Sequence, residues 1–458
     1  MNALILSAMG GVLMMFAGLT FKDGRTVRTI ALGLLLAVVG GTVAELAGYR
    51  FFDINTRGMM VFDRFALLFT LVAAVCTLAF FALSGKDMEA VGLHLSDYFA
   101  LIFFIFCGIV LSASFKSLLI LFLGIEIISI PLYILTGSDK RSLKSNEAAL
   151  KYFLMGAFST GLMLMGIALL YGASGTFMTT AMNLGDAAKV PVLAIMGMLL
   201  LLFSLSFKVS AAPFHFWTPD VYDGAPTVFT SFMATVVKAA SFIAFVRLFD
   251  DAFSGIGSQW KTTVALIAGI TLFVGNITAV FQQSVKRMLA YSSIAQAGFM
   301  MLAVYSLTAD AKEGLILYAA AYSLATIGIF AVLVRMDDYS FEGFNGLARQ
   351  EPVVAGALVV FLLSLAGIPL TAGFLSKLYM LKATVQGGSL GLAIFAVLMA
   401  AVSVYYYFRL IQAMYFKDNH GVTALLVTPT FKGGLIVLAA VTILLGIFPG
   451  LLTSWLYF

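Results

Sequence analysis

The sequence predicts an all-α integral membrane protein of about fourteen transmembrane helices, and three observations support this fold class. Hydrophobic residues make up 62% of the 458 residues and charged residues only 11%, whereas a soluble domain carries roughly a quarter charged residues. The mean hydropathy is +1.04. The apolar residues gather in runs of about twenty, the length that crosses a bilayer. A soluble fold would need a larger charged surface than this chain can supply.

The predicted spans follow from these runs, six in the first half of the chain and eight in the second. They cover residues 2–20, 28–48, 61–84, 97–114, 116–136, 150–171, 191–214, 228–249, 261–282, 287–307, 313–335, 353–384, 391–415 and 432–455. The first run lacks a basic flank and a small-residue cleavage site, so we interpret it as a retained helix and not as a signal peptide.

The charge distribution predicts the orientation of the chain. With the N-terminus outside, the loops after odd-numbered helices hold roughly fourteen Lys and Arg, against about eight in the other loops. Because cytoplasmic loops are enriched in these residues, we expect both termini outside. The net charge of +5 sits in short loops, which is typical of membrane anchors contacting lipid and argues against nucleic acid as a partner.

Two apolar runs are interrupted by proline in corresponding halves of the chain, at Pro213 and Pro369. Proline removes a backbone donor and clashes with the preceding turn, so each run predicts a broken helix whose freed groups face protein or water. Paired broken helices indicate inverted repeats in transporters. We therefore divide the chain into three N-terminal helices (1–96), a first five-helix unit (97–249), a second, inverted unit (250–415) and a C-terminal helix (416–458).

Four ionisable residues lie inside apolar runs, and Lys151 lies at the start of one. The four are Glu126, Lys208, Lys238 and Lys377. A charge at bilayer depth costs roughly 2.5–3.5 kcal/mol on insertion scales, so these residues are candidates for function. The alternatives are a snorkelling side chain for Lys238 or Lys377, a structural ion pair for Glu126, and an interfacial position for Lys151.

The remaining polar chemistry is sparse. His215 follows the break at Pro213 and is either a hydrogen-bonded structural residue or part of a relay. Cys76 and Cys107 lie in apolar runs with no His or Cys at ligand spacing, so we expect neither a metal site nor a disulfide. No dinucleotide fingerprint, cysteine cluster or haem-like histidine pair is present in the sequence, which predicts no redox cofactor in this chain.

Four segments carry a family resemblance. They are EAALKYFLMGAFS at 147–159, FKVSAAPFHFWTPDVYDGAPT at 207–227, VKRMLAYSSIAQAGF at 285–299 and LSLAGIPLTAGFLSKLYML at 363–381. Together they resemble the subunit N (NuoN) family of respiratory complex I. The resemblance implies fourteen helices with two inverted five-helix units and broken seventh and twelfth helices. It also implies a bacterial plasma membrane, because the animal mitochondrial form is shorter.

The resemblance assigns helices to the five charged residues. Glu126 matches the fifth-helix glutamate, and the matched lysines are Lys151 (sixth helix), Lys208 (seventh), Lys238 (eighth) and Lys377 (twelfth). A lysine in the twelfth helix also favours subunit N over its NuoM sibling.

The chain departs from many relatives at two positions. Gln296 stands near a common histidine, and Val237 replaces a proline that often precedes the eighth-helix lysine. Glutamine cannot take up a proton near neutral pH, so a relay step at that position is in doubt. The change at Val237 predicts only a different local bend.

These residues suggest a proton relay. Burial disfavours a charged lysine and a nearby carboxylate favours it, so moving Glu126 relative to Lys208 would switch proton binding. The proton would then pass through Lys238 toward Lys377. Hydroxyl groups predicted to orient the intervening waters belong to Ser206, Ser210, Tyr291, Ser292 and Ser293.

The resemblance places the redox chemistry in partner subunits, which carry NADH, FMN, iron–sulfur clusters and quinone. The implied partners are NuoM-like and NuoK-like neighbours, the rest of the membrane arm and the hydrophilic redox arm. The alternatives are an Mrp-type cation/proton antiporter subunit, a scaffold that braces the membrane arm, and a subunit that itself binds quinone.

Overall fold

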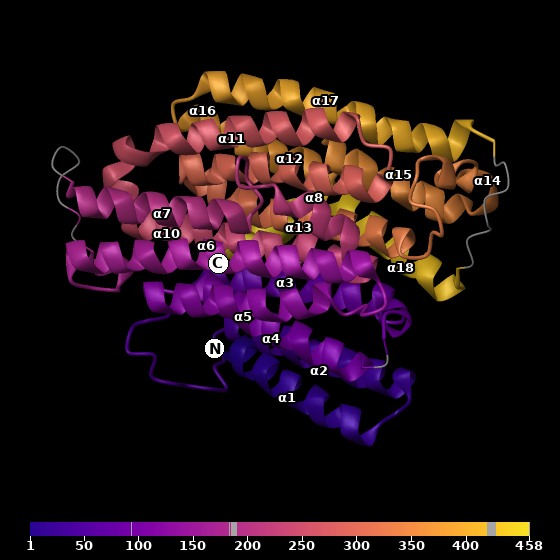
Figure 1. Cartoon of the computed structure of the whole chain (residues 1–458), viewed down its shortest axis with the longest axis horizontal. Helices are drawn as coiled ribbons and strands as arrows, with labels where there is room; N and C mark the ends of the chain where they lie inside the picture. The colour runs from indigo at the N-terminus through magenta and orange to yellow at the C-terminus, as the bar shows by residue number, and fades with distance from the viewer. Residues whose placement is uncertain (93, 183, 185–189, 419–426, 458) are drawn as a thin grey trace.

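The computed structural model describes residues 1–92, 94–182, 184, 190–418 and 427–457, which form helices and contain no strand. Figure 1 shows the long helices lying roughly side by side, from α1 and α2 at one edge to α17 at the other. The helices of the first part are α1 (Asn2–Thr20), α2 (Gly24–Leu46), α3 (Arg64–Ser84), α4 (Leu95–Ser114), α5 (Leu118–Thr136) and α6 (Leu143–Ser174).

The second part continues the same architecture. Its helices are α7 (Val192–Lys208), α8 (Trp217–Gly224), α9 (Thr227–Phe232), α10 (Lys238–Ala252), α11 (Gly257–Val280), α12 (Val285–Ser306), α13 (Ala309–Leu333), α14 (Leu347–Gln350), α15 (Pro352–Ala366), α16 (Ala372–Gln386), α17 (Leu390–Phe416), α18 (Pro429–Ile447) and α19 (Gly450–Thr453). In the described residues, twelve helices are long and apolar enough to cross a membrane, or thirteen if one bent pair counts as a span. The predicted all-α membrane class is confirmed.

The first predicted helix break is present, and it begins earlier than expected. We predicted a run to residue 214, but α7 ends at Lys208 and α8 begins at Trp217. Ser210 has a φ of 65°, a left-handed conformation that cannot continue an α-helix. The backbone N–H of Ala212 donates to Thr271 Oγ1 on α11 at 2.8 Å, so the broken segment is held by a neighbouring helix.

The second break divides the predicted run 353–384 into α15 and α16. Gly367 has a φ of 83°, which favours glycine. The N–H groups of Gly367 and Ile368 donate back to the carbonyls of Ser364 and Leu363, as in a Schellman ending. This local hydrogen bonding ends α15 three residues before Pro369.

The span that carries Lys238 is interrupted by a π-helical turn. Met233–Val237 form this turn between α9 and α10, directly before Lys238. A π-turn inserts an extra residue into the helical ladder and is frequent at functional sites. The sequence predicted a different local bend near Val237, and the structure has a π-helical turn at this position.

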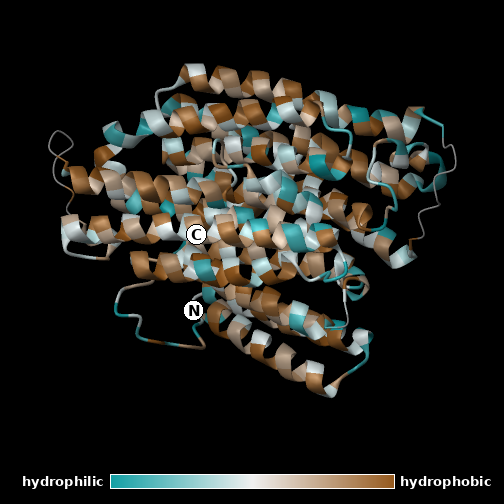
Figure 2. Cartoon of the chain, viewed as in Figure 1, coloured by the Kyte–Doolittle hydropathy of each residue, from teal (hydrophilic) through white to brown (hydrophobic). Residues whose placement is uncertain are grey.

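Helices α10, α12 and α13 form the interior. The apolar windows of the α9–α10 span and of α13 are entirely buried. The outer helices present apolar side chains, such as Phe158 on α6 at 71% exposure and Phe416 on α17 at 80%. Figure 2 shows this apolar character along the outer helices. Such a surface is suited to lipid and to other membrane proteins.

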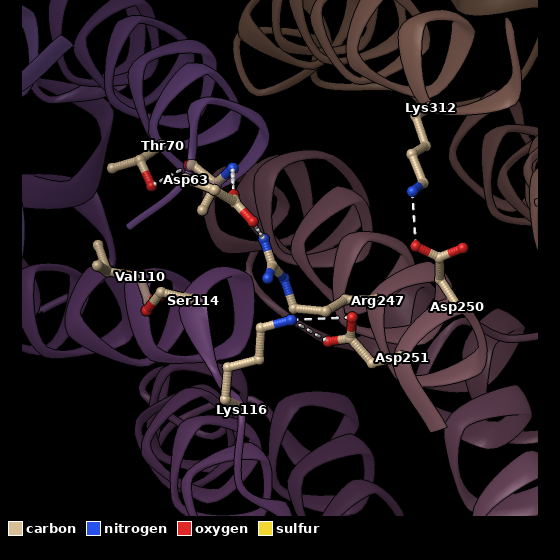
Figure 3. A network of polar contacts seen from close by, with 10 residues as sticks. Asp63, Thr70, Val110, Ser114, Lys116, Arg247, Asp250, Asp251 and Lys312 are labelled. Atoms are coloured by element: carbon tan, nitrogen blue, oxygen red, sulfur yellow. Dashed lines mark hydrogen bonds and ion pairs between the residues drawn. The ribbon is translucent and has the colours of Figure 1, made fainter. Parts of the chain in front are cut away.

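Ion pairs at the C-terminal end of α10 join three parts of the chain (Figure 3). The pairs are Arg247–Asp63 at 2.7 Å, Lys116–Asp251 at 2.9 Å and Lys312–Asp250 at 2.6 Å. They connect α10 to the start of α3, to the α4–α5 loop and to the start of α13. The Arg247 side chain is nearly inaccessible, whereas Asp63 is 42% exposed, so the pair holds a buried guanidinium against a carboxylate that still contacts solvent. These contacts fix the helix that carries Lys238.

Candidate functional site

The first break brings Lys208 close to Glu126. Lys208 is the last residue of α7, and its Nζ lies 3.9 Å from Glu126 Oε1 on α5. Thr160 of α6 donates its hydroxyl to the same oxygen at 2.7 Å, and Lys208 Nζ donates to Ser129 Oγ at 3.0 Å. The predicted Glu–Lys pair therefore exists, and two hydroxyl groups from neighbouring helices surround it.

Lys238 lies in the interior between the two breaks. Its Nζ donates to the carbonyl oxygen of Ser293 at 3.1 Å and to Ser293 Oγ at 2.8 Å, both on α12. The ammonium also lies 5.6 Å from the centre of the Tyr222 ring. Because the residue is buried, the snorkelling alternative is wrong for Lys238.

Lys377 lies at the second break. Its Nζ donates to the carbonyls of Leu365 at 2.6 Å and Ala366 at 3.1 Å, the last two residues of α15. These carbonyls have lost their helical partners, and a cation at a helix C-terminus also interacts favourably with the helix dipole. The Phe299 ring lies 4.7 Å away. Lys377 is buried and does not snorkel either.

Gln296 connects the interior to the second break. Its Nε2 donates to the Leu365 carbonyl at 3.0 Å and to Tyr407 Oη at 3.2 Å. The Tyr318 hydroxyl donates to Gln296 Oε1, and Ser292 Oγ shares a hydrogen bond with Tyr407. Glutamine thus takes a bridging position next to the carbonyl that also accepts from Lys377.

A cavity of about 10 Å³ lies beside this contact, lined by residues that include Gln296, Tyr318, Ser364, Ser376 and Lys377. That volume is close to the minimum for one water molecule, and the lining supplies polar partners. The second break therefore has room for a hydrogen-bonded water next to Lys377.

Lys151 belongs to a different environment. It pairs with Asp220 at 2.9 Å and with Glu147 at 2.8 Å, and its side chain is 41% exposed. Together with Arg287, these residues line an open hollow of about 160 Å³. Asp220 accepts hydrogen bonds from both Lys151 Nζ at 2.9 Å and Arg287 at 3.2 Å. The structure thus places Lys151 in a charged surface cluster and not with the buried lysines.

The five supporting hydroxyl residues fall into three groups. Ser292 and Ser293 contact the buried polar residues, as described above. Ser206 and Ser210 are buried at the first break, and within the described residues their hydroxyl oxygens have no hydrogen-bond partner. Tyr291 is only partly buried.

Two residues mark the first break itself. Pro213 lies in the segment between α7 and α8, and His215, which stacks on Phe216 with ring centres 4.7 Å apart, is almost fully buried there. No hydrogen bond links His215 to Lys208 or Glu126 in the described part of the chain.

Sequence reasoning missed several residues of the site. Thr160 and Ser129 read as ordinary polar residues in apolar helices, and only the packing of α5, α6 and α7 brings them to Lys208. Lys286 directly precedes the predicted run 287–307 and was not singled out, yet it is 3% exposed. Its signal was present, because it lies within the quoted segment at 285–299.

Metal chemistry has no candidate among the described residues, where no group of three or more His, Cys, Asp or Glu is placed to hold an ion. Cys76 and Cys107 are both buried and free. Cys107 Sγ lies 3.1 Å from Ser7 Oγ, so it acts as a packing residue between α4 and α1.

Comparison with known proteins identifies the family. The family described as NADH:quinone oxidoreductase/Mrp antiporter, transmembrane, matches residues 113–403. NADH-quinone oxidoreductase subunit N of Cytophaga hutchinsonii is 39% identical over 463 residues, covering 99% of this chain and 98% of that protein. The chain belongs to the subunit N family of NADH-quinone oxidoreductases. The resemblance predicted from the four sequence segments is confirmed.

Solved structures agree with membership of the subunit N family. A chain of respiratory complex I from Thermus thermophilus matches with a TM-score of 0.86 at 33% identity, covering 99% of this chain and 98% of that one. A chain of the Mrp complex from Dietzia sp. has the same TM-score of 0.86 at 19% identity, covering 99% of this chain and 96% of that one. The second likeness establishes a shared fold only.

Proposed function

We propose that this chain is the membrane-arm subunit N of a respiratory complex I and translocates protons across the membrane. The observation that carries the proposal is the placement of three buried lysines at the two helix breaks and between them. Lys208 lies beside Glu126 at the first break, Lys238 in the interior and Lys377 at the second break. Burying an ionisable residue in a membrane protein costs free energy, so a residue of this kind that is retained indicates function.

The chemistry is proton transfer without covalent change. Lys208 holds a proton while Glu126 lies near, and weakening that pair releases it toward Lys238. Ser293 and Gln296 of α12 continue the polar path to the Leu365 carbonyl and Lys377. Side chains and one or more waters in this path support stepwise proton movement.

Lys151 lies apart from the buried lysines of the path. Lys151 is assigned here to the charged hollow that contains Asp220 and Arg287, where it contacts solvent. In that position it serves proton collection at the surface more readily than transfer between buried groups. His215, Ser206 and Ser210 lie near the first break and are candidates for orienting water there.

The driving energy comes from partner subunits. In this proposal NADH, FMN, iron–sulfur clusters and quinone belong to those partners, with NuoM-like and NuoK-like neighbours flanking this chain in the membrane. The broad apolar outer surface supports a multi-pass position in a membrane. The excess of Lys and Arg in the loops after odd-numbered helices favours both termini outside. The similarity to a bacterial subunit N favours a bacterial plasma membrane. Quinone binding by this subunit has no supporting residue in the described site.

The repeat organisation is part of the same proposal. Counting α7–α8 and α15–α16 as broken seventh and twelfth helices gives fourteen spans. The units 97–249 and 250–415 would then each contain one break, with 1–96 and 416–458 outside them. Corresponding breaks in both units support an inverted repeat.

An Mrp-type antiporter subunit is the second candidate, because the Dietzia Mrp chain shares the fold. It predicts sodium-dependent transport without NADH. The 39% identity to a subunit N over almost the whole chain favours the first candidate.

The test is NADH-driven proton pumping in membrane vesicles that contain the assembled complex. Lys208→Met and Lys377→Met are each compared with wild type and with Lys382→Met. Lys382 is a matched control because it shares α16 with Lys377 but is 58% exposed. We expect pumping per NADH oxidised to fall in the first two variants only. Unchanged pumping in assembled complexes would favour the scaffold alternative.

A further inference from the structure

Lys286 is a buried lysine that the proposed relay does not use. It lies at the start of α12, and its Nζ donates to the carbonyls of Asp223 at 2.9 Å and Ala225 at 2.8 Å. Those carbonyls belong to the C-terminal end of α8, the short helix that follows the first break. A lysine that donates to the last carbonyls of a helix satisfies hydrogen-bond acceptors that have no partner within the helix. Its positive charge also interacts favourably with the negative end of the helix dipole.

A second contact holds the same short helix. Arg287, the next residue of α12, donates to Asp220 Oδ1 in α8 at 3.2 Å. The backbone N–H of Val285 donates to the Tyr339 carbonyl, and the Tyr339 ring lies 5.5 Å from Lys286 Nζ. Lys286 and Arg287, which belong to the second predicted unit, therefore both bind α8, an eight-residue helix of the first unit.

The start of α8 contacts the relay. Trp217 begins α8, and its Nε1–H donates to the Phe207 carbonyl at 3.0 Å. Phe207 directly precedes Lys208 in α7. A displacement of α8 would therefore act on the residue next to Lys208.

The other part of α12 contacts the rest of the path. Ser293 accepts both hydrogen bonds of Lys238, and Gln296 donates to the Leu365 carbonyl that also accepts from Lys377. Gln296 lies ten residues after Lys286, or roughly 15 Å along a helix. One continuous helix thus contacts both α8, which follows the first break, and the residues at the second break.

We propose that Lys286, with Arg287, is a positioning residue that ties α8 to α12, so that the two helix breaks are joined mechanically through α12. In this role Lys286 keeps its proton and transfers none; its ammonium group only holds the two carbonyls at the end of α8 in place. It holds α8 so that a shift at either break is transmitted to the other. The inference rests on the proposed proton-pumping function.

The experiment measures protons pumped per NADH oxidised, normalised to assembled complex, for Lys286→Met, Lys286→Arg, Lys208→Met and Lys382→Met. We expect Lys286→Met to lose at least half of the pumping that Lys208→Met loses, and Lys286→Arg to restore it. Arginine retains the charge and can donate to two carbonyls, but it does not release a proton. A purely structural role would reduce the amount of complex and leave the ratio unchanged.

The outcomes are separable. A normal ratio in Lys286→Met overturns the inference, and an equally low ratio in Lys286→Arg overturns it in favour of a proton-carrying lysine. Should Lys286→Met block assembly, Arg287→Gln decides, because Arg287 is partly exposed and its loss removes only the second contact. An unchanged ratio in Arg287→Gln then overturns the inference. Normal pumping in Lys208→Met would instead refute the proposed function itself.

Discussion

Replacing Glu126 by glutamine tests the ion pair at the first break. The substitution keeps the size of the side chain and an oxygen for the Thr160 hydroxyl, but it removes the negative charge 3.9 Å from Lys208 Nζ. At that distance and an effective dielectric constant of about 20, two unit charges attract by about 4 kcal/mol. We therefore expect Glu126→Gln to remove most of the stabilisation of the charged Lys208 and to abolish pumping by this subunit.

Glu89→Gln is the matched control. Glu89 also pairs with a basic residue, at 3.2 Å from Arg28, but its side chain is 40% exposed and it is no part of the proposed path. An exposed ion pair contributes little because water and salt screen it, so the shorter distance is outweighed by solvent. The assay is quenching of a pH-gradient dye in vesicles, divided by the rate of NADH oxidation. Equal pumping in both variants would refute the reasoning.

Two further changes probe other parts of the structure. Asp220→Asn should lower the melting temperature of the complex at low salt, because it removes the carboxylate that pairs with Lys151 at 2.9 Å and with Arg287 at 3.2 Å. Salt screens partly exposed ion pairs, so the difference from wild type should shrink as the salt concentration rises; a constant difference would contradict this. Gly373→Ala should reduce assembled complex, since its Cβ would overlap the Ser364 carbonyl, whereas Gly356→Ala on α15 meets no atom within 4 Å and should have no effect.

The fold class was predictable because a bilayer imposes a simple length and polarity rule on each span. The run at 2–20 coincides with α1, and most other runs differ from their helices by a few residues. The sixth run was too short, since α6 begins at Leu143, where amphipathic residues continue the helix beyond the apolar run. The π-turn before Lys238 has no comparable sequence rule, because it depends on how α9 and α10 pack.

The site was predictable where one charge stands in an apolar run. Placing a charge at bilayer depth costs free energy, and this argument alone singled out Glu126 and the three lysines Lys208, Lys238 and Lys377. Residues such as Thr160 and Tyr407 are common in membrane helices, so only the tertiary structure selects them. Lys286 was missed for another reason: at the end of a span, a buried lysine and a headgroup anchor have the same sequence pattern.

The most direct measurement is NADH-driven proton pumping by Lys238→Met in assembled complexes, with Lys382→Met as the control. Lys238 is the buried cation between the two breaks, and Ser293 accepts its described hydrogen bonds. A continuous path from Lys208 to Lys377 predicts that pumping per NADH oxidised falls as far as in Lys208→Met. Wild-type pumping in Lys238→Met would contradict a path through the centre of this subunit.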